Sequence, residues 1–163
     1  QDLFDSNNIL KEVYLNNNKI KFIKDDLFMK FKRLKILNLQ FNQINLIDEY
    51  ALYYLDLLEN LLLSNNNITN LNINTFNGLI QLRYLNLSSN FISYLNQNIF
   101  RNCRNLLELN LSNNKLKVIY NFTFFFLDQV RQIHLDKNYE LVLRENSLDG
   151  LLSVKNIFIS FQC

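Results

Sequence analysis

The chain lacks proline and tryptophan, and its 163 residues include only two glycines, two cysteines and one histidine. The glycines, Gly78 and Gly150, are too far apart to form the glycine-rich loops that hold phosphate groups. One histidine and two widely separated cysteines provide no zinc cluster, so we expect no metal and no cofactor. The composition also excludes collagen, a coiled coil and a disulfide mini-protein.

A strong charge of one sign and a long hydrophobic run are also missing. There are 17 Lys and Arg residues against 15 Asp and Glu residues, so net charge gives no reason to expect nucleic acid or an anionic membrane as partner. The apolar stretch from Phe122 to Leu127 is far shorter than the roughly 20 residues that cross a bilayer, and we expect no membrane insertion. No signal peptide is visible at residue 1, which leaves a cytosolic protein and a processed one both open.

The chain does contain a regular repeat with one fixed period. Its leading apolar position falls at Leu10, Leu34, Leu58, Leu82, Leu106, Val130 and Val154. An asparagine recurs with the same period at Asn18, Asn42, Asn66, Asn90, Asn114 and Asn138. Around these positions the frame L-x-x-L-x-L-x-x-N-x-I-x-x-L recurs, followed by F-x-x-L, and such self-similarity is the signature of stacked repeats.

The frame predicts one short strand in each repeat, because two of its apolar positions alternate with polar ones. Each strand must pair in parallel with its counterpart in the next coil, and only stacking can bury the apolar positions. The asparagine can satisfy backbone groups left unpaired where the chain leaves the strand, and asparagines can form the bends that glycine and proline do not. The sequence therefore predicts an α/β repeat solenoid, with irregular or short helical segments opposite the strands and a stacked phenylalanine column.

With these motifs the chain resembles the leucine-rich repeat family. The 24-residue length and the F-x-x-L tail are similar to its typical subclass, which includes Toll-like receptor ectodomains and secreted animal immune or adhesion proteins. The resemblance covers residues 10–162. It implies a curved arc with the strands on the concave face and the phenylalanine side on the convex face.

Departures from the frame suggest how the chain is divided. Residues 1–9 are interpreted as the tail of a preceding coil or a short N-terminal cap, because Phe4 lies one period before Phe28. Residues 10–153 form six repeats, and residues 154–163 begin a seventh, truncated one. The cysteine-rich caps of the family are not visible, so we hypothesise a segment of a longer protein or ends covered by a partner. Glu140 replaces an apolar residue, which predicts a local shift of the turn in the sixth repeat.

The expected concave surface carries an apolar and aromatic zone on its first four coils. Its members are Tyr14, Ile36, Phe41, Leu62 and Tyr84. Isolated exposed leucines and tyrosines are common on any protein surface. Five of them among polar neighbours favour a binding surface, since aromatic side chains are frequent anchors of interfaces.

Two other groups of residues are candidates for chemistry. Ser112, His134 and Asp136 could form a hydrolytic triad on paper, but a flat, wet sheet supplies neither a buried orienting aspartate nor an oxyanion hole. We therefore expect no enzyme and no catalytic residues. The adjacent acids Asp25 and Asp26 are interpreted as solvated rather than as a cation site.

The two cysteines are expected to differ. Cys103 occupies an inward position and is interpreted as a buried, reduced and inert side chain. Cys163 lies too far along the stack to pair with it. If the protein is secreted, we expect Cys163 to pair with a residue outside this segment.

Four N-x-S/T sequons are candidate glycosylation sites: Asn67, Asn86, Asn110 and Asn121. Asn86 and Asn110 are expected on the concave face, where sugars would direct ligands to the first coils or to a flank. Asn67 and Asn121 lie nearer the coil edges and are the better acceptors. In an asparagine-rich chain these motifs support secretion only weakly.

The resemblance implies a recognition module in an extracellular innate-immune receptor or a secreted immune factor. Its partner would be a protein ligand, a microbial molecule or another copy of itself, bound through the concave face or a flank. The alternative is a cell-adhesion or structural protein of neural or matrix contacts, and the fold alone does not separate the two. An intracellular scaffold and a hydrolase are the less favoured interpretations.

Overall fold

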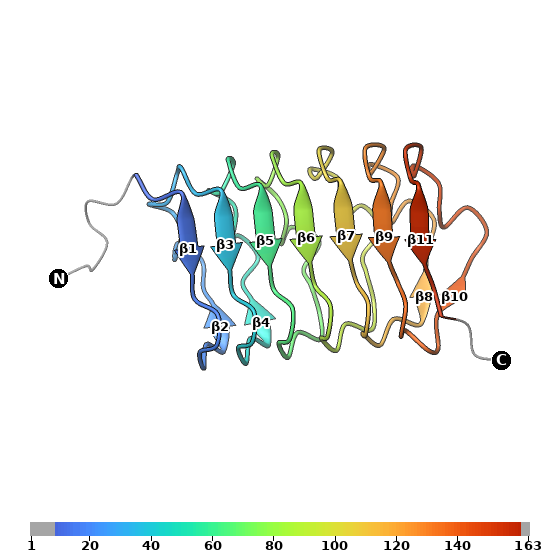
Figure 1. The fold of residues 1–163 in the computed structure, drawn as a ribbon, viewed down its shortest axis with the longest axis horizontal. Helices are drawn as coiled ribbons and strands as arrows, with labels where there is room; N and C mark the ends of the chain where they lie inside the picture. The colour runs from blue at the N-terminus through green and yellow to red at the C-terminus, as the bar shows by residue number, and fades with distance from the viewer. Residues whose placement is uncertain (1–8, 161–163) are drawn as a thin grey trace.

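The computed structural model describes residues 9–160, and Figure 1 shows a row of short strands that all point the same way. Seven of them form one parallel sheet in the order β1-β3-β5-β6-β7-β9-β11. Their bounds are Glu12–Tyr14, Ile36–Asn38, Asn60–Leu62, Tyr84–Asn86, Glu108–Asn110, Gln132–His134 and Asn156–Phe158. Each residue pairs with the one a full repeat along the chain, as in Leu61 with Leu85. The predicted solenoid of parallel strands is confirmed.

Two small parallel sheets follow the main sheet where the chain turns away from it. One joins β2, Phe22–Ile23, to β4, Leu46–Ile47. The other joins β8, Val118–Ile119, to β10, Val142–Leu143. Both keep the register of one full repeat, because each coil can find a backbone partner only in the coil beside it.

The core lies between the main sheet and the segments that return to the next strand. The middle residue of each inner strand is buried, as are the alternate leucines that follow, and the phenylalanine column packs against them. Phe76 and Phe100 stack with ring centroids 5.7 Å apart, and Phe100 and Phe124 stack at 6.3 Å. Parallel strands are spaced more closely, at about 4.8 Å. The phenylalanine side is therefore the longer, convex side, and the strand side is the concave one.

The segments opposite the strands are irregular rather than helical. Residues 9–160 contain no assigned helix, so the helical half of the α/β expectation has no counterpart in the described chain. The segments instead close single turns, for example from the Phe31 N–H to the Phe28 carbonyl at 2.9 Å and from Leu34 to Phe31 at 3.0 Å. Isolated i to i−3 bonds of this kind do not add up to a regular helix.

The repeated asparagines bond one coil to the next. Asn66 Nδ2 donates to the carbonyls of Leu39 and Leu63, each at 3.0 Å, and its Oδ1 accepts from the Ile44 N–H at 2.9 Å. The same bonds recur at the other buried rungs, which are Asn42, Asn90, Asn114 and Asn138. Asn18 is exposed and, within the part of the chain that the structure describes, its side chain donates only to Leu15 and Asn16 of its own coil.

The sequence suggests that the repeated asparagines form the bends. In the structure the bends occur one residue before the ladder asparagines. A positive φ of 52–58° falls at Asn17, Phe41, Asn65, Ser89, Asn113 and Lys137. Three of these six residues are asparagine, which tolerates left-handed backbone. The ladder asparagines need their side chains pointing inward, and the preceding residue takes up the reversal of the chain.

The predicted shift of the turn at Glu140 is confirmed. The equivalent residues Ile44, Ile68 and Ile92 are buried, whereas Glu140 is exposed and Leu141 takes a half-buried place against the core. A tight turn from the Leu141 N–H to the Asn138 carbonyl, 3.0 Å, accommodates the change. Register is regained at β10. Phe4, Gln162 and Cys163 lie outside the described residues.

Candidate functional site

The strand face, meaning the side of the seven-stranded sheet that points away from the core, carries two rows of side chains. The first row is Glu12, Ile36, Asn60, Tyr84, Glu108, Gln132 and Asn156. The second row, two residues further along each strand, is Tyr14, Asn38, Leu62, Asn86, Asn110, His134 and Phe158. Most residues of the two rows are polar, so the few apolar ones are candidates for contact with a partner.

Four of the five predicted binding residues form a zigzag across this face. Tyr14 and Leu62 belong to the second row, and Ile36 and Tyr84 belong to the first. Successive members are diagonal neighbours on adjacent strands, about 8 Å apart at their Cα atoms by strand geometry. Tyr14 and Tyr84 are exposed, whereas Ile36 and Leu62 are half-buried.

Phe41 is set apart from the other four. It lies five residues beyond Ile36, past the end of β3, at a left-handed bend with φ 53°. Its ring is 53% exposed. A phenylalanine gains nothing locally from this backbone conformation, since asparagine and glycine adopt it at lower cost.

The strand face is hollowed between β5 and β7. The hollow has a volume of ≈ 350 Å³, and its apolar lining comes from Leu62, Tyr84 and Leu85. Its polar lining comes from Asn60, Asn86, Glu108 and Asn110. An apolar floor beside a few hydrogen-bonding groups is the usual make-up of a ligand site.

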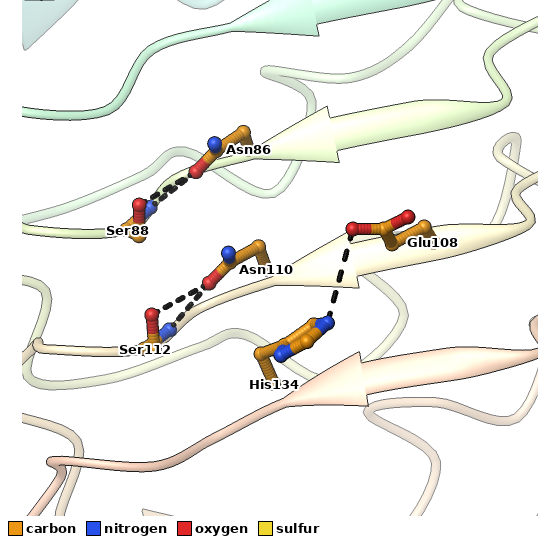
Figure 2. A network of polar contacts seen from close by, with 6 residues as sticks. All are labelled: Asn86, Ser88, Glu108, Asn110, Ser112 and His134. Carbon is orange, nitrogen blue, oxygen red and sulfur yellow. Dashed lines mark hydrogen bonds and ion pairs between the residues drawn. The ribbon is translucent and has the colours of Figure 1, made fainter. Parts of the chain in front are cut away.

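Two of the polar side chains that line the hollow, Asn86 and Asn110, are held by short local hydrogen bonds, as Figure 2 shows. Asn86 Oδ1 accepts from the Ser88 backbone N–H at 3.0 Å and from its hydroxyl at 2.7 Å. Asn110 and Ser112 repeat the arrangement at 3.0 and 2.8 Å. At the far end of the zigzag, the Tyr14 hydroxyl donates to Glu12 Oε2 at 2.9 Å, and this hydrogen bond raises the pKa of Tyr14.

The structure does not bring Ser112, His134 and Asp136 together as a hydrolytic triad. The Ser112 hydroxyl donates to Asn110, and the imidazole stacks on Phe158 with centroids 4.4 Å apart. Its Nε2 lies 3.8 Å from Glu108 Oε1 (Figure 2). Among the hydrogen bonds of residues 9–160, none joins the imidazole to Ser112 or Asp136, so the pair of nucleophile and base that such chemistry needs is not formed.

Asp25 has a structural partner. Its Oδ1 accepts from the Tyr50 N–H at 2.9 Å, and its own N–H donates to Asp48 at 3.2 Å. Asp26 takes a left-handed backbone with φ 64°. Within residues 9–160, no group of three or more histidine, cysteine, aspartate or glutamate side chains is placed to hold a metal ion.

Cys103 is fully buried in the stack, at the position where other repeats have leucine or phenylalanine. Burial raises the pKa of its thiol to about 12, so the reactive thiolate is suppressed at neutral pH.

The four sequon asparagines fall into two pairs. Asn86 and Asn110 are half-buried, and their Oδ1 atoms accept the serine bonds described above. Asn67 and Asn121 are exposed, and Asn121 Oδ1 accepts from Gln97 at 2.8 Å.

Sequence reasoning missed a second set of exposed aromatic side chains, on the return face, meaning the outer side of the irregular segments opposite the strands. Tyr50, Tyr53, Phe122 and Phe125 are all exposed there. A hollow of ≈ 420 Å³ lies beside Tyr53. The sequence does contain a signal for them, because Tyr50 and Tyr53 occupy the same repeat positions as Phe122 and Phe125, three coils further on.

The described residues contain no helix long and apolar enough to cross a membrane.

Stacked coils with one parallel strand each, joined by an asparagine ladder, define this protein as a repeat solenoid that presents side chains on an open sheet. A sequence profile described as leucine rich repeat matches residues 8–68, 56–116 and 81–139. The chain belongs to the leucine-rich repeat family. Comparison with curated proteins found no match.

Solved structures of leucine-rich repeat proteins superimpose closely on the chain. The structure described as a TLR13–ssRNA13 complex has 28% identity and a TM-score of 0.85, with 94% of this chain and 22% of that chain covered. The leucine-rich repeat domain of APL1 has 29% identity and a TM-score of 0.84, with 94% and 40% covered. The chain thus spans less than half the length of either, and the RNA belongs to the TLR13 structure.

Proposed function

We propose that the chain is a non-catalytic recognition module that binds a protein or a microbial molecule through its concave strand face or a flank. The observation that carries this proposal is the apolar zigzag from Tyr14 to Tyr84, which meets a hollow with a polar rim on an otherwise polar sheet. Exposed aromatic side chains that line a hollow are favourable anchors, because a partner removes them from water.

The setting we propose is extracellular, in a Toll-like innate-immune receptor or a secreted immune factor, with N-glycans on some of the four sequons. Similarity to the TLR13 and APL1 structures over 94% of the chain supports this choice over an adhesion role. We expect no nucleic acid as ligand, since the net charge of +2 supplies little of the attraction that phosphate backbones require.

The proposal is tested by binding with the immobilised chain. Species captured from the extracellular fluid of the source organism are identified, and their affinity is then measured for wild type, Tyr14→Ala, Leu62→Ala and Tyr84→Ala. We expect each substitution to weaken binding at least about fivefold, the level reached by interface anchors. Tyr53→Ala, on the opposite face, is the matched control and should bind as wild type does.

If all three strand-face variants bound every captured species as tightly as the wild type does, binding through the zigzag would be refuted. Turnover of a substrate that is lost in His134→Ala would refute the non-catalytic part of the proposal.

A further inference from the structure

The strand-face hollow contains two side-chain amides that are held in the same orientation. Asn86 and Asn110 are paired neighbours on β6 and β7, and adjacent parallel strands lie about 4.8 Å apart. In each, Oδ1 accepts from both the N–H and the hydroxyl of the serine two residues on, at 2.7–3.0 Å. Figure 2 shows both oxygens turned towards the serines and both Nδ2 atoms turned away from them. The two amide groups therefore repeat at the strand spacing.

Towards a ligand, these two amides can act only as hydrogen-bond donors. An amide oxygen has two lone pairs, and the serine occupies both. Within residues 9–160, neither Nδ2 atom has an acceptor of its own. A ligand that satisfies both amides must therefore bring two acceptor atoms about one strand spacing apart.

The same hollow also contains a carboxylate. Glu108 lies beside Tyr84 on the neighbouring strand, and its carboxylate accepts no hydrogen bond from any residue that the structure describes. His134 Nε2 is 3.8 Å from Oε1, which is beyond hydrogen-bond distance. The ligand must therefore also bring a donor. Leu62 and the Tyr84 ring provide an apolar surface next to these polar groups.

Charge and spacing disfavour the other common classes of ligand in this hollow. An anion would meet Glu108, and the seven strands of the main sheet contain no lysine or arginine to attract it. A cation would meet the positive ends of the two amide groups. An extended peptide presents carbonyls to one side only at every second residue, about 6.6 Å apart, which is wider than the strand spacing. An entirely apolar ligand would bury the amides and the carboxylate without partners.

We propose that the strand-face hollow binds a neutral sugar, a pyranose with the configuration of glucose. The equatorial oxygens O2 and O4 of such a ring are separated by about one strand spacing, so each can accept from one amide. A hydroxyl also donates, and Glu108 accepts from the hydroxyls at this edge of the ring. The C–H face of the ring packs against Tyr84 and Leu62. This inference rests on the proposed function, because it names the class of ligand for the same face.

The linkage between sugar units decides which polymers of glucose can bind in this way. A 1,3 linkage leaves O2 and O4 free on every unit, whereas a 1,4 linkage uses O4 on all units but the last. In galactose O4 is axial, and it lies closer to O2 than one strand spacing. A 1,3-linked glucose chain therefore offers the matching pair of hydroxyls at every unit.

The first test measures the binding of three soluble β-linked tetrasaccharides to the full chain by calorimetry. They are a 1,3-linked glucose tetramer, a 1,4-linked glucose tetramer and a 1,3-linked galactose tetramer. We expect the first to bind with a dissociation constant of about 1 mM or lower. The other two should bind at least about fivefold more weakly, because the pair of hydroxyls is incomplete or wrongly spaced. No binding of the first at about 10 mM, or equal binding of all three, overturns the proposal.

The second test removes the amide donors alone. Asn110→Asp keeps an oxygen for the bonds from Ser112 but loses the N–H donors, so it should weaken binding of the 1,3-linked glucose tetramer at least about fivefold. Asn86→Asp repeats the test. Asn38→Asp is the matched control, because Asn38 Oδ1 accepts from the Gln40 N–H at 3.1 Å in the same way but lies outside the hollow. Unchanged affinity of both hollow variants, or equal weakening by the control, overturns the site.

The sugar site and the proposed function fail in different ways. If no tetramer binds but Tyr14→Ala, Leu62→Ala and Tyr84→Ala weaken binding of a captured protein, the recognition function stands and the sugar site is wrong. If neither the tetramers nor the captured species depend on this face, both are wrong. Captured glycoproteins are also assayed after enzymatic removal of their glycans. Loss of binding then identifies a sugar carried by a protein, and retained binding together with binding of the tetramer identifies a free oligosaccharide.

Discussion

At the scale of single residues, the asparagine ladder is the most exacting feature of the sequence. Each buried rung is an acceptor for one coil and a donor for two, so its loss leaves backbone groups of both coils without partners. A buried unpaired backbone group costs about 1–3 kcal/mol. Among uncharged side chains only the amides of asparagine and glutamine offer two N–H donors and a carbonyl acceptor, and glutamine is one methylene longer.

We predict that Asn90→Ala lowers the free energy of unfolding by about 2–5 kcal/mol, because the Ile68 N–H and the Leu63 carbonyl lose their partner. Urea denaturation followed by circular dichroism measures the change. Asn18→Ala is the matched control, since Asn18 is exposed and bonds only its own coil, and it should cost less than about 1 kcal/mol. Equal losses for the two variants would contradict the role of the ladder.

Phe41 occupies a left-handed bend that suits asparagine better. We predict that Phe41→Asn raises the free energy of unfolding by about 1 kcal/mol and that the reverse change at the equivalent position, Asn65→Phe, lowers it by a similar amount. Thermal melting of both variants checks the pair. A phenylalanine kept at a position of backbone strain is consistent with a role in contact, as strained residues cluster at functional sites. A lower melting temperature for Phe41→Asn would show that the ring contributes to stability.

Cys103 gives a prediction that depends on pH. Its folded-state pKa of about 12 lies above the ordinary value of 9.0 because burial disfavours the thiolate. The stability that the protonated, buried thiol contributes to the folded state is therefore complete below pH 9. It is lost as the pH rises towards 12, because the unfolded chain releases the thiol proton first.

Iodoacetamide at pH 8 should leave Cys103 unmodified in the native protein and alkylate it in urea. Rapid native labelling of the Cys103 peptide would contradict its burial.

At the scale of elements, the strands were predictable and the return segments only in part. Alternating leucines specify a strand because only one face of the sheet meets the core, and the repeat period specifies its partner. The return segments lack such a pattern. Their F-x-x-L motif fixes the inward ring, but whether the surrounding residues form a helix or single turns depends on packing against the next coil. That packing also sets the exposed aromatic side chains of the return face, where the backbone of Tyr53 lies against Gly78 and that of Phe125 against Gly150 of the next coil.

Gly78, which lies against the Tyr53 backbone, tests this packing. Gly78→Ala should lower the free energy of unfolding by more than about 2 kcal/mol, because a Cβ would overlap the Tyr53 carbonyl and φ is +88°. Gln81→Ala, an exposed position three residues later, is the control and should change stability by less than about 0.5 kcal/mol. Denaturant titration compares them. A neutral Gly78→Ala would mean that the two coils can separate there without cost.

At the scale of the whole molecule, the sequence predicted the solenoid, and the resemblance to leucine-rich repeat proteins predicted which side would be concave. The repeat positions also separate Ile36 and Tyr84 from Tyr14 and Leu62, and these pairs lie in different rows of the sheet. Phe41, expected on the same surface, lies past the end of β3. Row and diagonal neighbours depend on register, which the repeat supplies, but the hollow between β5 and β7 depends on side-chain packing, which it does not.

Glycosylation distinguishes the two faces of the molecule. When the chain is secreted from eukaryotic cells, we predict glycans on the exposed Asn67 and Asn121 and low occupancy at Asn86 and Asn110. Glycopeptide mass spectrometry measures the fraction of each asparagine that carries a glycan, and an Asn→Gln variant of each site confirms the assignment of its glycopeptide. Full occupancy of Asn86 would place a sugar in the strand-face hollow and redirect any ligand to a flank. A chain without sugars at all four sites would weaken the extracellular proposal.

The rungs described above reach back by one coil and no further. During synthesis, a newly emerged coil can therefore dock on the one made just before it, without waiting for the rest of the polypeptide. Order can spread along the nascent chain in steps of one repeat, and the total length of the array is not limited by any closure of the two ends.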